Sequence, residues 1–171
     1  MKKVGILTFH SANNYGGCLQ AYALQTALCG LGAQAEIIQF QGEKLSLQPI
    51  ANRSLKARVM DFIIKTGSMM VKVASAPGFN RFRKQYYHYS QPIKRETINQ
   101  LNDQYDLFLS GSDQVWNCNI TGELEVYLQT FVKDSKKKGS YAASFGIKTL
   151  PEDKKPVYDA AIRDFQYLSV R

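Results

Sequence analysis

The chain has 171 residues, of which 44% are hydrophobic and 12% aromatic, a composition typical of a folded globular protein and not of a disordered one. The net charge of +8 favours anionic ligands such as phosphates or acidic glycans, or else reflects an ordinary soluble surface, and the dispersed basic residues form no nucleic-acid-binding motif. No apolar run approaches the ~18 residues of a membrane span, and the three cysteines lack metal-ligand spacing. We therefore expect no zinc site, no disulfide framework, no nucleic-acid partner and a reducing cytoplasmic location.

The first 40 residues predict a β-α-β unit. The apolar run Val4–Phe9 predicts a strand buried on both faces, Cys18–Leu31 a helix, and Ala35–Phe40 a second, parallel strand. Gly30 or Gly32 is expected to end the helix. The apolar residues with the spacing of one helical face are Leu24, Ala27, Leu28 and Leu31.

The rest of the chain continues the alternation of strands and helices. The segment at about 42–95 predicts a helical excursion over one face of the sheet, in which aromatic residues of a third helix at Phe79–Tyr89 bury themselves. The later elements are expected to be a short helix at Glu96–Gln104, strands at Tyr105–Ser110 and Lys138–Phe145, a helix after Pro151 and the start of a fifth strand at Tyr167–Arg171. The fold class is therefore α/β, a Rossmann-like parallel sheet flanked by helices. Because the chain stops in an apparent strand, we expect it to be the N-terminal domain of a longer protein.

Three predicted strands end at clusters of glycine and polar residues. These clusters begin at His10, at Gly111 and at Ser144, and the first two lie more than 100 positions apart. Ligands of open parallel α/β sheets bind in the crevice beyond the carboxyl ends of the strands. One site built from all three clusters is therefore expected.

The first cluster, His10–Gly17, precedes a helix N-terminus, where free backbone N–H groups favour an anion. A tight turn that needs glycine and asparagine for its geometry alone is the other interpretation. The spacing is not that of a dinucleotide fingerprint, and the second strand ends without the acidic residue that binds a ribose, so we expect no NAD. His10 is a candidate proton carrier or anion contact. The candidate binding residues here are Asn13, Asn14, Tyr15, Gly16 and Gly17.

The second cluster, Gly111–Asn117, contains Asp113, a candidate base that could accept a proton from a sugar hydroxyl. Trp116 could stack on a sugar ring and Asn117 could bind its hydroxyl groups. The alternatives are that Asp113 caps a helix and that Trp116 is a core residue. The further candidate binding residues here and in the third cluster are Gly111, Ser112, Gln114, Ser144 and Gly146.

Several of these motifs resemble the polysaccharide pyruvyl transferase family. The resemblance covers most of the chain except the excursion at 42–95. The segments that carry it are Gly5–His10, Asn14–Gly17 with Leu19–Leu24, Gly111–Asn117, Ser140–Gly146 and Leu168–Arg171.

The resemblance implies a two-domain fold similar to GT-B glycosyltransferases and transfer of a pyruvyl group from phosphoenolpyruvate to a sugar, as a cyclic ketal. The second domain would supply much of the donor site, Asp113 or His10 would act as base or orient the hydroxyl, and Arg171 would contact the donor. No metal or other cofactor is implied, and a lipid-linked acceptor would bring the protein to the membrane surface. A nucleotide-sugar glycosyltransferase and a non-catalytic glycan- or partner-binding module are the alternatives.

Overall fold

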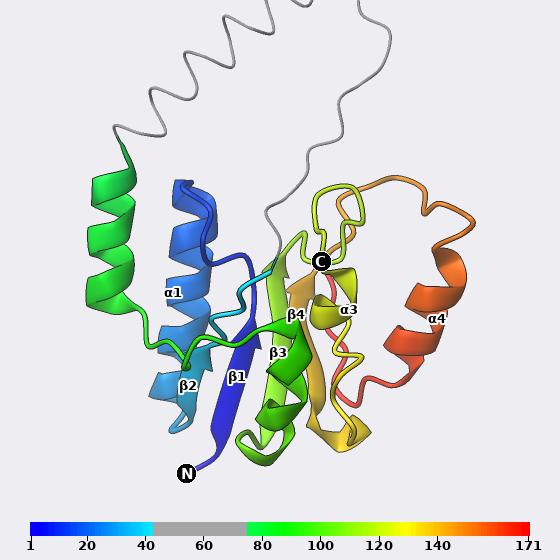
Figure 1. Ribbon diagram of the computed structural model, residues 1–171, viewed down its shortest axis with the longest axis horizontal. Coiled ribbons are helices and arrows are strands. Elements are labelled where there is room, and N and C mark those ends of the chain that lie inside the picture. Colours follow the sequence, from blue (N-terminus) through cyan, green and yellow to red (C-terminus); the bar gives the residue numbers. More distant parts are fainter. Residues whose placement is uncertain (43–74) are drawn as a thin grey trace, which may run out of the picture.

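A four-stranded parallel sheet forms the centre of the molecule in the computed structural model, which describes residues 1–42 and 75–171 (Figure 1). The strands are β1 (Lys3–Leu7), β2 (Gln34–Ile37), β3 (Leu107–Asp113) and β4 (Lys138–Ala143), in the order β2-β1-β3-β4. All three pairings are parallel, so the four carboxyl ends lie along one edge. The predicted α/β class is confirmed.

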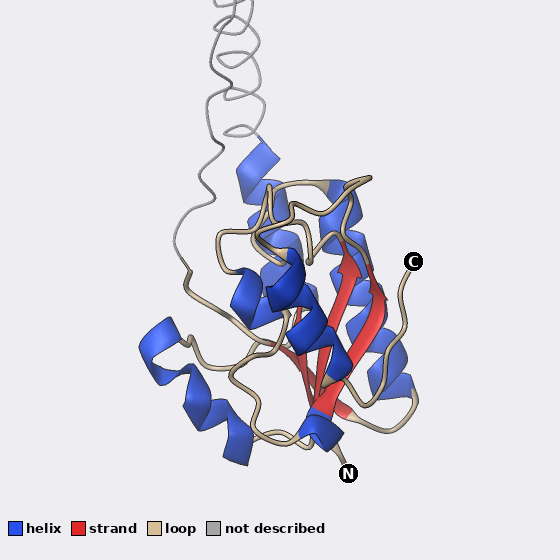
Figure 2. Ribbon diagram, turned by 90° about the vertical axis from the view of Figure 1, so that its right-hand side faces the viewer, coloured by secondary structure: helices blue, strands red, loops and turns tan. Residues whose placement is uncertain are grey.

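Helices cover both faces of this sheet (Figure 2). They are α1 (Tyr15–Gly30), a helix at residues 75–86, the 3-10 helix η1 (Arg95–Asp103), α3 (Leu124–Tyr127), the short 3-10 helix η2 (Ser135–Lys137) and α4 (Lys155–Arg163). No helix in the described ranges is long and apolar enough to cross a membrane. Residues 43–74 of the predicted helical excursion lie outside the described residues.

Helix α1 differs from its prediction at its start and in the face that it buries. It begins three residues early, at Tyr15, because the Asn14 side chain caps it by accepting from the Gly17 N–H at 2.5 Å. It ends as predicted before Gly32, whose φ of +84° closes a Schellman motif. The predicted face is partly wrong: α1 buries Gly17, Cys18, Ala21, Leu24 and Gln25, whereas Ala27 and Leu31 are exposed.

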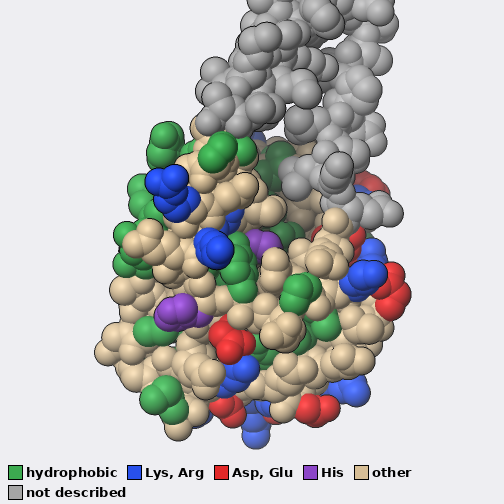
Figure 3. All heavy atoms as spheres, turned by 60° about the vertical axis from the view of Figure 1, so that its left-hand side comes forward, with side chains coloured by type: hydrophobic (Ala, Val, Ile, Leu, Met, Phe, Trp, Pro, Cys, Tyr) green, Lys and Arg blue, Asp and Glu red, His purple; other side chains and the backbone are tan. Residues whose placement is uncertain are grey.

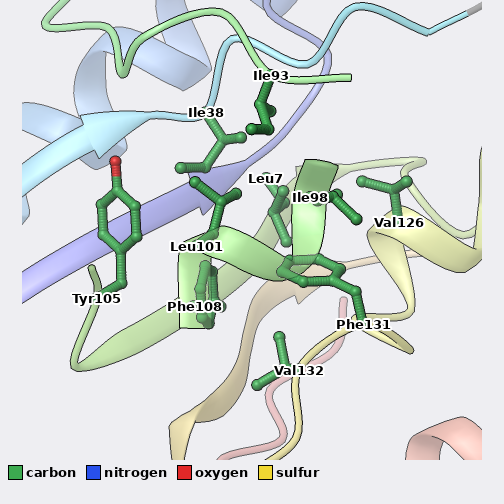
Figure 4. Close-up of a cluster of buried hydrophobic side chains, with 10 residues drawn as sticks. All are labelled: Leu7, Ile38, Ile93, Ile98, Leu101, Tyr105, Phe108, Val126, Phe131 and Val132. Carbon is green, nitrogen blue, oxygen red and sulfur yellow. The ribbon is translucent and has the colours of Figure 1, made fainter. Parts of the chain in front are cut away.

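Two hydrophobic cores lie on opposite faces of the sheet, because successive strand residues point to opposite sides. Val4 and Ile6 of β1 pack with Ala21 and Leu24 of α1. On the other face, η1 and α3 cover a second cluster (Figure 4). Its members are Leu7, Ile38, Ile93, Ile98, Leu101, Tyr105, Phe108, Val126, Phe131 and Val132.

The excursion returns to the sheet through helix 75–86, which packs on α1. The rings of Tyr22 and Phe82 lie 5.8 Å apart, and the Tyr87 hydroxyl donates to the Cys18 carbonyl at 2.9 Å. The chain then runs along β2, where Tyr89 bridges Ile37. On the face that Figure 3 shows, basic side chains are dispersed among neutral and acidic ones. The predicted aromatic helix face is confirmed in part: Phe79 and Tyr87 are buried, Tyr86 is 40% exposed, and the helix ends at residue 86 and not at Tyr89.

Strand boundaries differ from the predictions at the carboxyl edge. Strand β1 ends at Leu7 and not at Phe9, whereas β3 continues beyond Ser110 to Asp113 because Gly111, with φ +117°, pairs with Tyr141. The predicted fifth strand is present as two isolated parallel bridges to β4, made by Tyr167 and Val170. This segment brings Arg171 to the same edge as the other strand ends (Figure 1).

Candidate functional site

The reversal point of the strand order lies between β1 and β3. The chain passes from β1 to β2 on one side and from β3 to β4 on the other. Crevices for ligands form at such points, beyond the carboxyl ends of the strands. The residues that follow Leu7 and Gly111 therefore lie where a ligand is expected.

A three-residue network joins these two strand ends. The Gln20 side chain donates to the Thr8 hydroxyl at 2.8 Å and accepts from the Ser112 hydroxyl at 2.9 Å. The Thr8 hydroxyl in turn donates to the Ser112 carbonyl at 3.2 Å. Ser112 is thus placed beside β1 as predicted, whereas Thr8 and Gln20 were not identified from the sequence. Gln20 could have been recognised by its position three residues after Gly17, in the first turns of the helix that follows the first cluster.

In the first cluster, several candidate residues serve local geometry. Asn14 caps α1, and a Cβ at Gly17 would lie 2.9 Å from the Asn14 side-chain oxygen, so the cap requires glycine there. This supports the tight-turn interpretation for these two residues. Tyr15 is 76% exposed, and no described residue accepts from the backbone N–H of Tyr15 or Gly16. Within residues 1–42 and 75–171, these two groups therefore have no acceptor that would compete with a ligand.

His10 is held in its neutral form. Burial and, secondarily, the nearby Arg83 guanidinium lower the pKa of His10 from 6.5 to about 4. Its ring meets the Tyr89 ring edge-on, with centroids 5.4 Å apart. A neutral imidazole accepts or relays a proton at neutral pH, but it lacks the charge with which an imidazolium attracts an anion. The lowered pKa therefore argues against His10 as an anion contact, and its role as a proton carrier stays a prediction.

Asn13 points away from solvent toward helix 75–86. Its side-chain oxygen accepts from the Arg83 guanidinium at 2.8 Å. Arg83 was not identified from the sequence, where it stood among other basic residues at 81–84. It lies far from the strand ends along the chain, and only the tertiary structure brings it to the loop.

A hollow of about 520 Å³ opens beside the first cluster. The apolar rings of Phe9, Phe40 and Tyr127 contribute to its wall, together with His10 and the Glu123 carboxylate. Burial, and secondarily Glu123, raises the pKa of Tyr127, whose phenol therefore stays protonated. Glu123 is itself paired with the Arg95 guanidinium at 3.3 Å. The lining therefore combines aromatic side chains with a carboxylate and a neutral imidazole.

The remaining lining of this hollow comes from Ser11, Ala12, Gly42, Ile120, Thr121 and Gly122. None of the residues from 120 to 127 was singled out from the sequence. They lie in the connection after β3 and carry no recognisable motif. Only the folded structure shows that they lie close to the residues that follow β1.

Asp113 stands at the end of β3 with φ +101°. One carboxylate oxygen accepts from the Gln114 N–H at 2.8 Å, and its carbonyl accepts from the Ser144 N–H at 3.0 Å. No helix begins here in the described chain, so the helix-cap alternative is wrong and Asp113 caps a turn. Its second carboxylate oxygen has no hydrogen-bond partner among the described residues. The predicted role of Asp113 as base stays a prediction.

Trp116 belongs to the core, and the prediction that it stacks on a sugar is wrong. The side chain is completely buried between Phe145 and Phe165, and its indole N–H donates to the Tyr127 carbonyl at 3.0 Å. The Tyr158 hydroxyl donates to the Trp116 carbonyl at 2.5 Å, which joins α4 to this segment.

Asn117 and Gln114 are also occupied by local contacts. Asn117 is 4% exposed and donates to the Gln114 side-chain oxygen at 3.0 Å, and its own oxygen accepts from the Asn119 N–H. An Asn117 so enclosed is not free to bind hydroxyl groups, which corrects that prediction. Gly146, with φ +62°, leaves room for Gln114: a Cβ there would overlap the Gln114 amide. Glycine is required at position 111 for a similar reason, because a Cβ on Gly111 would overlap the Tyr141 carbonyl oxygen.

Ser144 and Arg171 lie together at the end of β4. The Arg171 guanidinium donates to the Ser144 hydroxyl at 3.5 Å, and the Arg171 N–H donates to the Ala143 carbonyl. The Arg171 side chain is exposed, so a cation stands at the edge where the strands end. In residues 1–42 and 75–171, no group of three His, Cys, Asp or Glu side chains is arranged to hold a metal ion.

Comparison with known proteins yields one match. The sequence profile of the polysaccharide pyruvyl transferase family matches residues 14–171, which include all three strand-end clusters except His10–Asn13. No curated protein matches the chain significantly, and no solved structure does. The profile covers most of the chain and agrees with the α/β fold on which the site is built. The chain therefore belongs to the polysaccharide pyruvyl transferase family.

Proposed function

We propose that the protein transfers the pyruvyl group of phosphoenolpyruvate to two hydroxyl groups of a sugar in a polysaccharide or its precursor. The match to the pyruvyl transferase family over residues 14–171 carries this proposal. The common edge at which the parallel strands end, and the hollow next to His10 after β1, support it. The donor, the ketal product and the acceptor class are all parts of the proposal.

The chemistry requires one proton delivered and two removed. A proton added to the methylene carbon of phosphoenolpyruvate forms the methyl group, and a sugar hydroxyl then attacks the central carbon. The bond from that carbon to the phosphate oxygen breaks, inorganic phosphate leaves, and the second hydroxyl closes the ketal ring. A base that accepts a hydroxyl proton and positive charge opposite phosphate and carboxylate lower the barriers.

Asp113 and His10 are the proposed base and hydroxyl-orienting group. One oxygen of the Asp113 carboxylate has no hydrogen-bond partner among the described residues, and the His10 imidazole is uncharged, so either can accept a hydrogen bond from a sugar hydroxyl. The exposed guanidinium of Arg171 and the free N–H groups at the start of α1 are the proposed contacts for the anionic donor.

The acceptor is proposed to occupy the hollow next to His10. Its aromatic wall offers faces for a sugar ring, and Glu123 and Thr121 offer acceptors for hydroxyl groups. A neutral sugar fits a hollow that already contains a carboxylate better than the anionic donor does, because like charges repel.

The Asp113→Asn variant tests the chemistry. We expect turnover, measured as phosphate released from phosphoenolpyruvate in the presence of acceptor glycan, to fall about 10²–10⁴-fold, the usual contribution of a general base. Asp159→Asn, at an exposed position on α4, is the matched control and should retain normal turnover. Normal turnover of Asp113→Asn would remove Asp113 as the base.

Donor binding is tested separately by thermal unfolding. A ligand that binds the native state raises the melting temperature, by the equivalent of about 2.7 kcal/mol at a hundredfold excess over its Kd. Phosphoenolpyruvate should raise it more than equal concentrations of inorganic phosphate or pyruvate. A rise with a nucleoside diphosphate and none with phosphoenolpyruvate would favour a nucleotide-sugar glycosyltransferase instead.

A further inference from the structure

The Arg83 guanidinium joins helix 75–86 to three consecutive residues of the loop between β1 and α1. One terminal nitrogen donates to the carbonyl oxygens of Ser11 and Ala12, at 3.4 and 3.3 Å. The other donates to the side-chain oxygens of Asn13 and Asn80, each at 2.8 Å. The rigid fork of an arginine therefore spans the loop and its own helix at once.

The loop depends on this clamp because it has little other support. Residues 11–13 make no backbone–backbone hydrogen bond with any other described residue. Helix 75–86, by contrast, is fixed to α1 by aromatic contacts such as that between Phe82 and Tyr22. Arg83 thus fixes a loop without regular structure relative to a helix that is packed on α1.

We propose that Arg83 is a positioning residue of the candidate site, which holds the β1–α1 loop and the adjacent His10 in place. Both terminal nitrogens are engaged by protein acceptors, so we assign Arg83 to holding the loop and not to binding the donor phosphate. The contacts between Arg83 and the loop do not depend on any assumed function, whereas their importance for catalysis rests on the proposed function.

The charges around His10 agree with this role. Tyr89 meets its ring, and the pKa of Tyr89 is raised to about 12 by burial, so this phenol is neutral. Tyr127 and Glu123 line the hollow with His10, and Tyr127 is likewise protonated. Glu123 is paired with Arg95. Arg83 is therefore the cation that disfavours a second positive charge on His10, in addition to burial.

Two NMR measurements without substrate test the proposal. The chain has only two histidines, so the imidazole signals of His10 and His88 can be assigned with one His10→Gln variant. In Arg83→Met, the titration midpoint of His10 should rise above about 4 while that of His88 stays unchanged. Backbone order parameters of residues 11–13 should fall from the rigid range near ~0.85 toward ~0.6. Arg81→Met, at an exposed position of the same helix, should change neither quantity.

Arg83→Lys separates the fork from the charge. Lysine keeps the positive charge but cannot hold several acceptors in one plane, so we expect a low His10 midpoint together with lowered order parameters at 11–13. Asn13→Ala removes one acceptor and leaves helix 75–86 intact, so it gives the loop test even where Arg83→Met unfolds. Unchanged order parameters in Arg83→Lys and Asn13→Ala would overturn the proposal. Since neither measurement involves phosphoenolpyruvate, such a result would leave the proposed transfer reaction untouched.

Discussion

The first cluster, His10–Gly17, and the segment Gly111–Asn117 at the end of β3 look alike in the sequence but differ in the structure. Each lies at the end of a buried strand and contains glycine, asparagine and an aromatic residue. In the first cluster, Tyr15 is 76% exposed and His10 borders a hollow. In the segment, Trp116 and Asn117 are buried and bonded to the protein itself. A polar cluster at a strand end therefore marks the edge of the sheet, while neighbouring elements decide which of its residues face a ligand.

The two clusters differ because α4 and Phe165, which follows it, cover only the second cluster. The segment after β3 is covered by Tyr158 and Phe165, which pack on Trp116 together with Phe145. The loop after β1 has helix 75–86 at its side, and that helix contacts it through the polar Arg83 side chain. Apolar side chains packed over the segment at the end of β3 make its residues part of the core. The loop after β1 is held by the polar Arg83 side chain and stays uncovered.

Replacing Trp116 should produce the largest effect on stability. Trp116→Ala leaves a large cavity and removes one of the two hydrogen bonds that the Tyr127 carbonyl accepts, so we expect the free energy of unfolding to fall by about 4 kcal/mol. Chemical denaturation measures this, with Tyr167→Ala, at a side chain that is 58% exposed, as the control. A loss as small as that of the control would place Trp116 at the ligand site instead of the core.

The pH dependence of stability tests the other region. Because the folded pKa of His10 is about 4 and its ordinary value is 6.5, the unfolded chain binds more protons between these values. The stability that the neutral His10 contributes is fully present above pH 6.5 and is lost as the pH falls toward 4. The difference between the two pKa values corresponds to about 3 kcal/mol of unfolding free energy. Denaturation of the wild type and of His10→Gln between pH 7 and 4.5 measures it. Equal slopes for the two proteins would contradict the burial of a neutral His10.

Removing the cap of α1 should have the smallest effect. Asn14→Ala leaves the Gly17 N–H without its acceptor and should cost about 1 kcal/mol, whereas Asn14→Ser should retain most of the stability. Asn119→Ala, in a turn without a helix to cap, is the matched comparison in the segment after β3. An Asn14→Ala protein as stable as the wild type would assign Asn14 to ligand binding alone.

Much of the fold was predictable because it follows from local patterns. The apolar run after Lys3 is a strand, Gly32 ends α1, and the helix α4 follows Pro151. The ends of elements were less predictable, since the Asn14 cap and the extension of β3 beyond Gly111 depend on single contacts.

What the amino-acid sequence determined by itself was the order of strands and helices, the place of the glycines that end them, and the family. The elements and their glycines follow from periodicity and from backbone preferences that act over a few residues, whereas the family follows from the resemblance of several motifs and from the profile match. Only the tertiary structure decided that Trp116 is core, that Arg83 clamps the loop and that Glu123 and Tyr127 border His10. Burial and pairing of these side chains are set by elements dozens of residues away, which no local pattern records.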